Sequence, residues 1–196
     1  REIVEFGRES ETQPLRLVLL LDVSGSMSKL LGDMSAKASG ALRQLHPGDQ
    51  VAVMVFASKT DIVLPFTTDL KKVPEAIVMN VFKTTSGRET YLNEAILSAA
   101  GYLKEQPAAG RKGILVVTEN EGARTAAKDT DVLRSLHDAD AVLNAILVGI
   151  NKKPHSAPGR YSDPGSAQPD VYSFVQNTGG DVIADEPLAL ATHDQR

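Results

Sequence analysis

Apolar segments alternate with amphipathic ones along most of this chain, and that order constrains the fold more than any other feature. Segments typical of strands buried on both faces run over Leu15–Leu21, Gln50–Phe56, Lys112–Thr118 and Ala141–Ile150. Stretches with helical periodicity separate them. The alternation predicts an α/β fold, a doubly wound, Rossmann-like three-layer sandwich with a mostly parallel central sheet of about six strands.

The remaining elements are predicted from their end signals. Helices are expected over 29–45, the later part of 67–81, 90–104, 130–138 and 171–176, and a final helix is expected to begin within 186–195. Two more strands are expected over Thr60–Phe66 and Asp181–Ala184. The link Ala57–Lys59 is short enough for a hairpin, and Pro65 suits an edge, so strand 60–66 is expected to be the one antiparallel edge strand.

Length and composition limit the classes of function. A chain of 196 residues with 42% hydrophobic content can bury one core, so we expect a single domain over 1–196, with 1–14 as a lead-in segment. Because the first residue is Arg1, we expect it to be a fragment of a longer protein. A net charge of −4 argues against nucleic acid or anionic lipid as the main partner.

Two further absences narrow the chemistry. The sequence has no cysteine, which excludes disulfides, thiolate catalysis and cysteine-type zinc sites. No apolar run reaches the roughly 18 residues that a membrane-spanning helix needs, so direct membrane insertion of this segment is not expected.

Oxygen-bearing side chains gather where the predicted strands end. Asp22, Ser24 and Ser26 follow the first apolar strand, and Gly25 allows a tight turn between the serines. Thr90 stands at the start of a predicted helix, and Glu119 directly follows strand 112–118. Ligands of parallel sheets bind beyond the carboxyl ends of the strands, and hard divalent cations prefer oxygen ligands. The five side chains therefore predict a metal site at this edge.

These motifs carry a resemblance. "DVSGS" after an apolar strand, a threonine before "YLNEAI" and an acid after "ILVVT" resemble the von Willebrand factor type A domain, whose metal-ion-dependent adhesion site is written Asp-x-Ser-x-Ser, then Thr, then Asp. The segments "LDVSGSM", "PGDQVAVMVFAS" and "NTGGDVI" resemble bacterial members, and the resemblance extends from Leu15 to about Leu190. It implies the metal ligands Asp22, Ser24, Ser26, Thr90 and Glu119.

The sequence departs from the family at the last of these positions. Where the family usually has Thr-Asp-Gly, this chain reads Thr118-Glu119-Asn120. Glutamate keeps the charge but is one methylene longer, so its oxygens lie about 1.5 Å further out, the length of one C–C bond. Glu119 could ligate directly where aspartate would act through water, or it could be displaced. A scaffold with a weakened metal site is therefore one alternative.

The resemblance implies a function and a location. We expect a protein-binding, adhesion-type module that holds Mg²⁺, or Mn²⁺ or Ca²⁺, and engages a carboxylate of a partner protein. It is not expected to be an enzyme. The alternative is a divalent-metal hydrolase of phosphatase type on the same edge, although Ser24 stands where such an enzyme would place a second acid. Bacterial relatives are often exported or associated with the cell envelope, which is the expected location.

Simpler explanations exist for each motif. Ser26, Ser28 or Thr90 could cap a helix instead of binding metal. The pattern Ser26-x-x-Lys29 fits acyl-serine enzymes, but its companion motifs are absent. The four histidines lack ligand spacing. The Pro- and Gly-rich segment 151–170 follows a strand's carboxyl end, so it is expected to shape partner choice, and the final helix is a candidate switch.

Overall fold

The structure, a computed structural model, describes residues 13–25, 27, 32, 36, 39–40, 42–81, 89–107, 110–120, 123–124, 126–148 and 170–184. The expected final helix and the segment 151–169 lie outside these residues, as does most of the expected helix 29–45. The described residues of that helix at 32, 36, 39, 40 and 42 have helical backbone.

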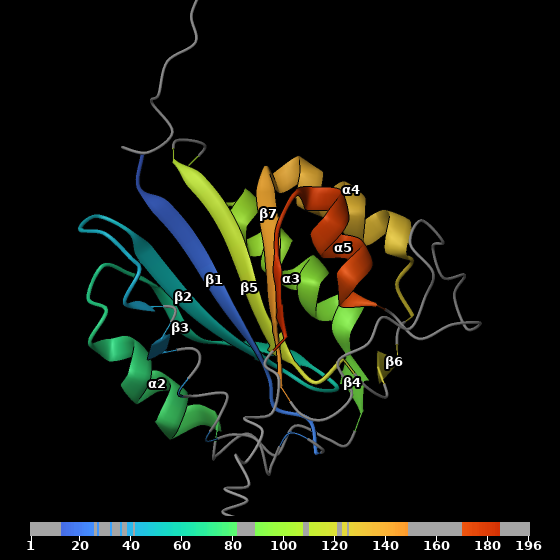
Figure 1. The fold of residues 1–196 in the computed structure, drawn as a ribbon, viewed down its shortest axis with the longest axis horizontal. Helices are drawn as coiled ribbons and strands as arrows, with labels where there is room; N and C mark the ends of the chain where they lie inside the picture. Colours follow the sequence, from blue (N-terminus) through green and yellow to red (C-terminus); the bar gives the residue numbers. More distant parts are fainter. Residues whose placement is uncertain are drawn as a thin grey trace, which may run out of the picture.

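A six-stranded sheet forms the centre of the molecule (Figure 1). Its strands are β1 (Leu15–Asp22), β2 (Gln50–Phe56), β3 (Thr60–Thr67), β5 (Arg111–Thr118), β7 (Ala141–Leu147) and β8 (Val182–Ala184), in the order β3-β2-β1-β5-β7-β8. All neighbours pair in parallel except β2 and β3. The doubly wound, mostly parallel sheet with one antiparallel edge strand is therefore confirmed.

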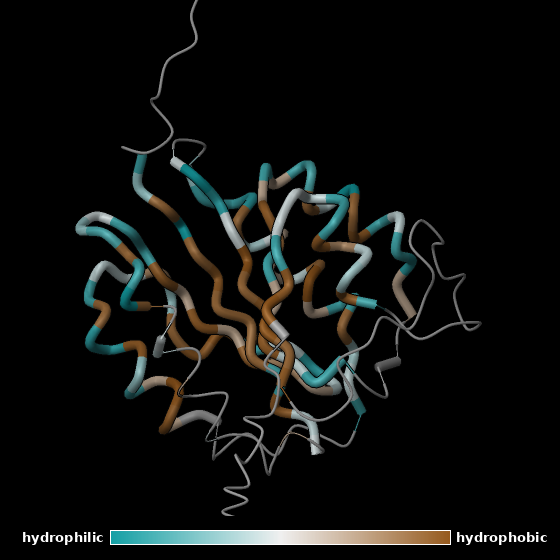
Figure 2. Tube along the Cα trace, viewed as in Figure 1, coloured by the Kyte–Doolittle hydropathy of each residue, from teal (hydrophilic) through white to brown (hydrophobic). Residues whose placement is uncertain are grey.

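Helices cover both faces of the sheet, because both faces of its central strands are apolar. On one face, β1, β5 and β7 pack against α3 (Leu92–Lys104), α4 (Asp129–Ala139) and α5 (Val171–Thr178). On the other face, α2 (Lys72–Val81) contributes Val73 and Ile77 to a second apolar cluster. Figure 2 shows the strands as the most hydrophobic segments, with the helices on either side. The strands β1, β2 and β5 are thus held rigidly between two apolar layers.

One expected element differs from the structure in a way that affects the site. The helix predicted from Thr90 begins at Leu92, and Thr90–Tyr91 forms the short strand β4, which pairs in parallel with β6 (Ala123–Arg124). Tyr91 is the N-cap of α3 and makes no side-chain capping bond. Thr90 is therefore not a helix cap, so that simpler explanation is wrong. Two-residue strands carry too little sequence pattern to be predicted.

A hydrogen bond to a side chain of β7 holds the start of the edge strand β8. Asn144, which interrupts the apolar pattern of β7, accepts a hydrogen bond from Asp181 N through its Oδ1 at 3.0 Å.

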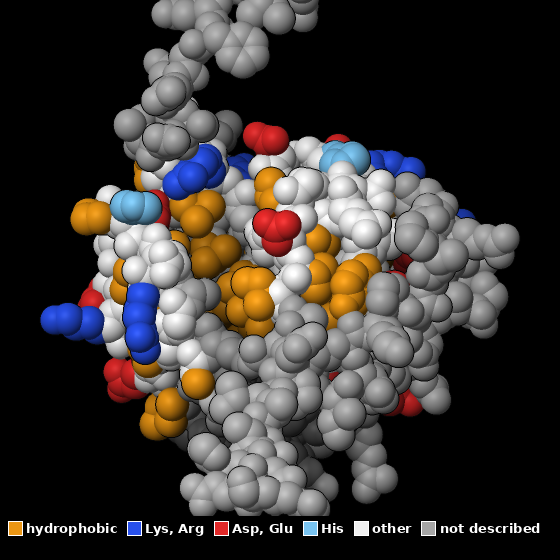
Figure 3. Space-filling model, viewed as in Figure 1, with side chains coloured by type: hydrophobic (Ala, Val, Ile, Leu, Met, Phe, Trp, Pro, Cys, Tyr) orange, Lys and Arg blue, Asp and Glu red, His pale blue; other side chains and the backbone are white. Residues whose placement is uncertain are grey.

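Apolar side chains gather on the face seen in Figure 3, and Val142 and Ile183 are among the exposed large hydrophobic residues. In the part of the chain that the structure describes, no helix is long and apolar enough to cross a membrane.

Candidate functional site

The strand order reverses between β1 and β5, and the predicted ligands Asp22 and Glu119 lie at the ends of these two strands. From β1 the chain moves outward to β2 and β3, and it later returns to the other side of β1 as β5. In parallel sheets this switch point opens a crevice at the carboxyl ends of the two strands. Asp22 ends β1 and Thr118 ends β5. In Figure 1 these ends lie at the lower edge of the sheet, toward β4 and β6.

Asp22 is the central acid of this crest, which we define as Asp22, Ser24, Thr90, Thr118 and Glu119. Its side chain is completely buried, with an exposed fraction of 0%. Thr118 Oγ1 donates to Asp22 Oδ2 at 2.7 Å, and Ser24 N donates to Asp22 Oδ1 at 3.0 Å. Both carboxylate oxygens are therefore oriented by neighbours from the ends of β1 and β5.

Burial makes the negative charge of Asp22 costly. Desolvation raises the pKa of Asp22 from 3.8 to about 6, although hydrogen bonds from Thr118 and from the side chain and backbone of Ser24 act in the opposite direction. The negative charge of Glu119 makes a smaller contribution to this raised pKa, so the two carboxylates are close enough to repel each other. None of the ion pairs between described residues includes Asp22.

The serine-rich loop places one of its two hydroxyls at the crest. Ser24 is almost fully buried, and its carbonyl oxygen accepts a hydrogen bond from Met27 N at 3.0 Å, which closes a tight turn directly after β1. Met27 is buried in the apolar cluster that also contains Val73 and Ile77, so packing against the core anchors the end of this turn. Ser26, the second serine of the predicted site, lies outside the described residues.

Backbone contacts bring Thr90 to the same edge. Tyr91 N donates to Ala57 O at 3.0 Å, and Val23 N donates to Phe56 O at 2.8 Å, so the segments after β1 and before α3 both meet the end of β2. Thr90 is buried, with 4% of its surface exposed. The threonine that the sequence selected therefore lies beside the first loop, although 68 positions separate it from Asp22.

Two residues at the start of α3 tie this corner to the segment before α4. Asn93 Nδ2 donates to Asp129 Oδ1 at 2.8 Å and to Ala127 O at 3.0 Å. Glu94 Oε1 accepts from Ala126 N and Ala127 N. The side-chain oxygen of Asn93 is buried and has no hydrogen-bond partner among the described residues. Asn93 and Glu94, three and four residues after Thr90, therefore fix the segment that directly follows it.

The third corner is the turn after β5. Glu119 is half-buried, and Asn120 follows it with a left-handed backbone conformation, φ 56°. Glycine, the family's usual residue here, and asparagine both tolerate this conformation, so the departure in sequence preserves the turn. Asn120 N donates to Thr118 Oγ1 at 3.1 Å.

The sequence did not reveal the partners of Asn120. Its Nδ2 donates to Asp170 Oδ1 at 3.2 Å, and its Oδ1 accepts from Val171 N at 3.2 Å. The available signals were an asparagine in place of glycine and an aspartate just before a helical segment, which is an N-cap signature. Neither signal shows that the two residues meet, because 50 positions separate them.

The donors at the crest suit a hard divalent cation. The buried side chains of Ser24 and Thr90 would offer a cation neutral hydroxyl oxygens, and Asp22 and Glu119 supply negative charge that has no cationic partner among the described ion pairs. The described residues contain no group of three or more His, Asp or Glu side chains placed to hold a metal, so a site here would depend on hydroxyls.

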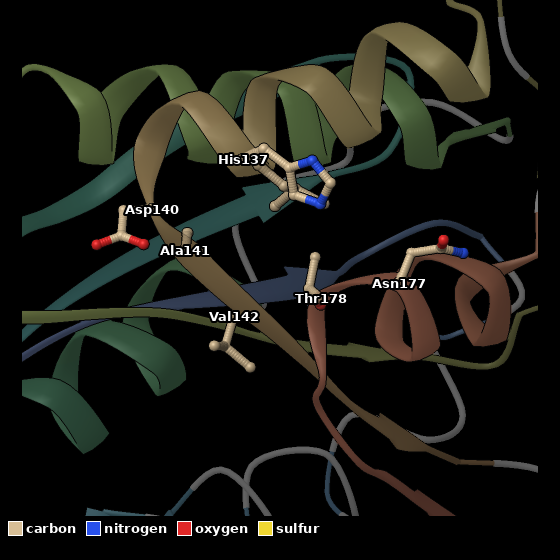
Figure 4. A pocket seen from close by; sticks show the side chains of 7 residues that line it. His137, Asp140, Ala141, Val142, Asn177 and Thr178 are labelled. Atoms are coloured by element: carbon tan, nitrogen blue, oxygen red, sulfur yellow. The ribbon is translucent and has the colours of Figure 1, made fainter. Parts of the chain in front are cut away.

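A second hollow lies at the opposite end of the sheet, where β7 begins. It has a volume of about 330 Å³, and Figure 4 shows His137 and Asp140 at the end of α4 beside Asn177 and Thr178 at the end of α5. The crest lies at the carboxyl ends of the strands, whereas His137 lies at their amino ends, so His137 is remote from the predicted metal ligands. His46 also lies at the amino end, where its backbone N–H donates to Asp49 Oδ2.

Comparison with known sequences identifies the family. The sequence model of the von Willebrand factor type A domain matches residues 17–121, which is more than half of the chain and includes all three corners of the crest. The chain belongs to the von Willebrand factor type A family. No curated protein sequence matches it at a significant level.

Solved structures agree with a von Willebrand factor type A fold. The conserved hypothetical protein BatB from Bacteroides thetaiotaomicron superimposes with a TM-score of 0.68 at 20% identity, over 88% of this chain and 90% of that one. An aerotolerance-related membrane protein from Bacteroides fragilis NCTC 9343 gives a TM-score of 0.66 at 20% identity, over 88% and 92%. A von Willebrand factor type A protein from Catenulispora acidiphila gives 0.64 at 16% identity, over 89% and 39%.

Proposed function

We propose that this domain is a binding module that engages a carboxylate of a partner protein through a divalent cation held at the crest. The observation that carries the proposal is the completely buried carboxylate of Asp22 at the switch point of the sheet, with no basic side chain paired to it among the described residues. A buried charge costs several kcal/mol unless an opposite charge compensates it. A cation bound beside Asp22 provides that compensation.

The ligand assignment follows the chemistry of the donors. Ser24, Thr90 and, by sequence, Ser26 would contact the cation through neutral oxygens, while Asp22 and Glu119 would neutralise its charge from the flanks. Mg²⁺ is the expected ion, with Mn²⁺ or Ca²⁺ as substitutes. With mostly neutral oxygens around it, the bound cation would supply positive charge and an open coordination position for an external carboxylate. The protein's part is to fix the hydroxyls and to keep bulk water away from Asp22.

We further propose that the domain is not an enzyme. A phosphatase that used Asp22 as its nucleophile would need a second acid two residues later, and that position is Ser24. We also propose that the domain is bacterial and functions outside the cytoplasm or at the cell envelope. The description of the Bacteroides fragilis neighbour as a membrane protein supports this location. Recovery of the native protein only from the cytosolic fraction of its cells would contradict it.

Isothermal titration tests the binding function. We expect Mg²⁺ or Mn²⁺ to give saturable heat with the wild-type domain and none with Asp22→Ala. The matched control is Asp181→Ala, because Asp181 is exposed at the start of β8, away from the crest, and this variant should bind metal normally. A glutamate-containing peptide should then bind only when metal is present. Absence of heat with the wild-type domain would favour a scaffold without metal.

A phosphatase assay separates the module from an enzyme. We expect no turnover of a generic phosphate ester in the presence of Mg²⁺. Turnover by the wild-type domain that is lost in Asp22→Ala would establish the hydrolase instead.

A further inference from the structure

The side chain of Asn120 joins the metal-site crest to helix α5. Asn120 is buried, with 1% of its surface exposed, and each end of its amide makes a different contact. Its Nδ2 donates to Asp170 Oδ1, and its Oδ1 accepts from Val171 N, each at 3.2 Å. Asp170 is the N-cap of α5 and also accepts from Tyr172 N at 3.1 Å. Asn120 therefore completes the cap of a helix that is distant in sequence.

The same residue is joined to the acid at the centre of the crest. Asn120 N donates to Thr118 Oγ1, and that hydroxyl donates to Asp22 Oδ2. A continuous chain of hydrogen bonds thus runs from Asp22 through Thr118 and Asn120 to the first turn of α5. Each of these side chains is buried. In a buried chain of this kind, displacement of one group leaves its neighbours unpaired, which is costly.

Glu119 lies between Thr118 and Asn120, two residues that the chain of hydrogen bonds holds in place. Thr118 and Asn120 are both held by hydrogen bonds, and the left-handed backbone of Asn120 sets the direction of the turn. Glu119 therefore belongs to a turn whose backbone is fixed by these hydrogen bonds, and the side chain of Asn120 anchors that turn to α5. In Figure 1 the amino end of α5 lies toward the same edge of the sheet as the ends of β1 and β5. Glycine at position 120 would preserve the turn but could not make either side-chain bond to α5.

We propose that Asn120 is a positioning residue that holds Glu119 for metal binding and couples occupancy of the crest to the first turn of α5. The inference rests on the proposed metal-binding function. It assigns to this chain a connection that relatives with glycine at the same place lack.

Three variants test the proposal. Asn120→Gly keeps the left-handed turn and removes both bonds to α5. Asn120→Asp keeps an acceptor for Val171 N but places a carboxylate against Asp170. Combining Asn120→Asp with Asp170→Asn restores one donor and one acceptor with the same shapes. The matched control is Asp140→Gly, because Asp140 has a similar left-handed backbone, φ 53°, at the opposite end of the sheet.

Two measurements are made on each folded variant, with folding checked by circular dichroism. Titration calorimetry with Mg²⁺ gives the dissociation constant, and two-dimensional NMR follows the amide resonances of Val171 and Tyr172 during the titration. We expect Asn120→Gly and Asn120→Asp to weaken Mg²⁺ binding by about ten- to a hundredfold, as for other groups that orient metal ligands. We expect the amide resonances of Val171 and Tyr172 to shift during the Mg²⁺ titration of the wild-type domain and to stay unchanged in Asn120→Gly. The exchanged pair should recover affinity, and Asp140→Gly should match the wild type.

The outcomes distinguish the two proposals. If the wild-type domain binds no Mg²⁺, the proposed function fails and the inference fails with it. If the wild-type domain binds Mg²⁺ but Asn120→Gly binds equally well, or the amides of Val171 and Tyr172 do not move in the wild type, only the coupling is refuted. Failure of the exchanged pair to recover affinity while it folds normally would likewise refute the role of the side-chain bond.

Discussion

Thr118 Oγ1 donates a 2.7 Å hydrogen bond to Asp22 Oδ2 and so joins the ends of the two central strands, β5 and β1. The bond spans 96 positions of sequence and lies where the strand order of the sheet reverses. It orients the buried carboxylate on which the proposed metal site depends. The same hydroxyl accepts from Asn120 N, so one threonine organises both the acid and the turn that carries Glu119.

Replacing Thr118 tests the strength of this junction. Thr118→Val keeps the shape of the side chain but removes the donor to Asp22 and the acceptor for Asn120 N. We expect the free energy of unfolding of the metal-free domain to fall by about 1–3 kcal/mol, the cost of leaving buried polar groups unpaired. Urea unfolding measures this loss. Thr60→Val is the control, because the hydroxyl of Thr60 has no hydrogen-bond partner among the described residues, and a comparable loss there would contradict the account.

The raised pKa of Asp22 predicts how the stability of the metal-free domain depends on pH. Since the folded pKa of about 6 exceeds the ordinary value of 3.8, the folded state retains a proton that the unfolded state releases. This contribution to stability is complete below pH 3.8 and is lost as pH rises through about 6. The shift corresponds to roughly 3 kcal/mol at 1.36 kcal/mol per pKa unit.

Comparison with Asp22→Asn isolates this contribution, because all other titrating groups are shared. Urea unfolding in EDTA at several pH values should show the wild-type domain losing stability relative to Asp22→Asn between pH 3.8 and about 6. Parallel stability curves for the two proteins would show that burial does not perturb Asp22 as described.

Glu119 should affect both the proton and the metal. Because its charge raises the pKa of Asp22, Glu119→Gln should lower that pKa in the metal-free domain. It should also weaken Mg²⁺ binding, since one of the two acids at the crest is neutralised. Carbon-detected NMR titration of Asp22 and calorimetry measure the two effects. An unchanged Mg²⁺ affinity would place Glu119 outside the metal's surroundings.

The contacts of Asn93 predict a role in the stability of the Thr90 corner. Asn93→Ala removes the donor to Asp129 and to Ala127 O. Because these acceptors are largely buried, we expect a loss of about 1–3 kcal/mol in the free energy of unfolding. Asn177→Ala, at an exposed position of α5, should change it by no more than about 0.5 kcal/mol. Equal losses in urea unfolding would show that Asn93 has no special part in holding this corner.

The sequence predicted the parts of the fold that depend on periodic apolar pattern. Runs such as Leu17–Leu21 can be buried on both faces only in a central parallel strand, and Pro65 correctly marked the antiparallel edge. The pattern could not predict the strand Thr90–Tyr91, because two residues have no periodicity. Thr90 nevertheless lies at the expected edge of the sheet, since the order of the motifs, not the element type, determined its place; its role as a metal ligand stays a prediction.

For the candidate site, the sequence suggested candidate residues but not the contacts that hold them in place. The strand ends placed Asp22 and Glu119 at one crest because the carboxyl ends of parallel strands share an edge. The link from Asn120 to Asp170 depends on how α5 packs beside β7, and no local pattern contains that information. The roles of Ser26 as a ligand, of Mg²⁺ and of a protein partner stay predictions.

Crystals soaked in Mn²⁺ test the central claim most directly, because anomalous scattering locates manganese independently of the protein. The account predicts an anomalous peak at the crest, with the hydroxyls of Ser24 and Thr90 at ligand distance, about 2.0–2.3 Å, and the carboxylates of Asp22 and Glu119 beside it. An empty crest in crystals that bind Mn²⁺ elsewhere, or hydroxyls that point away from the peak, would contradict it.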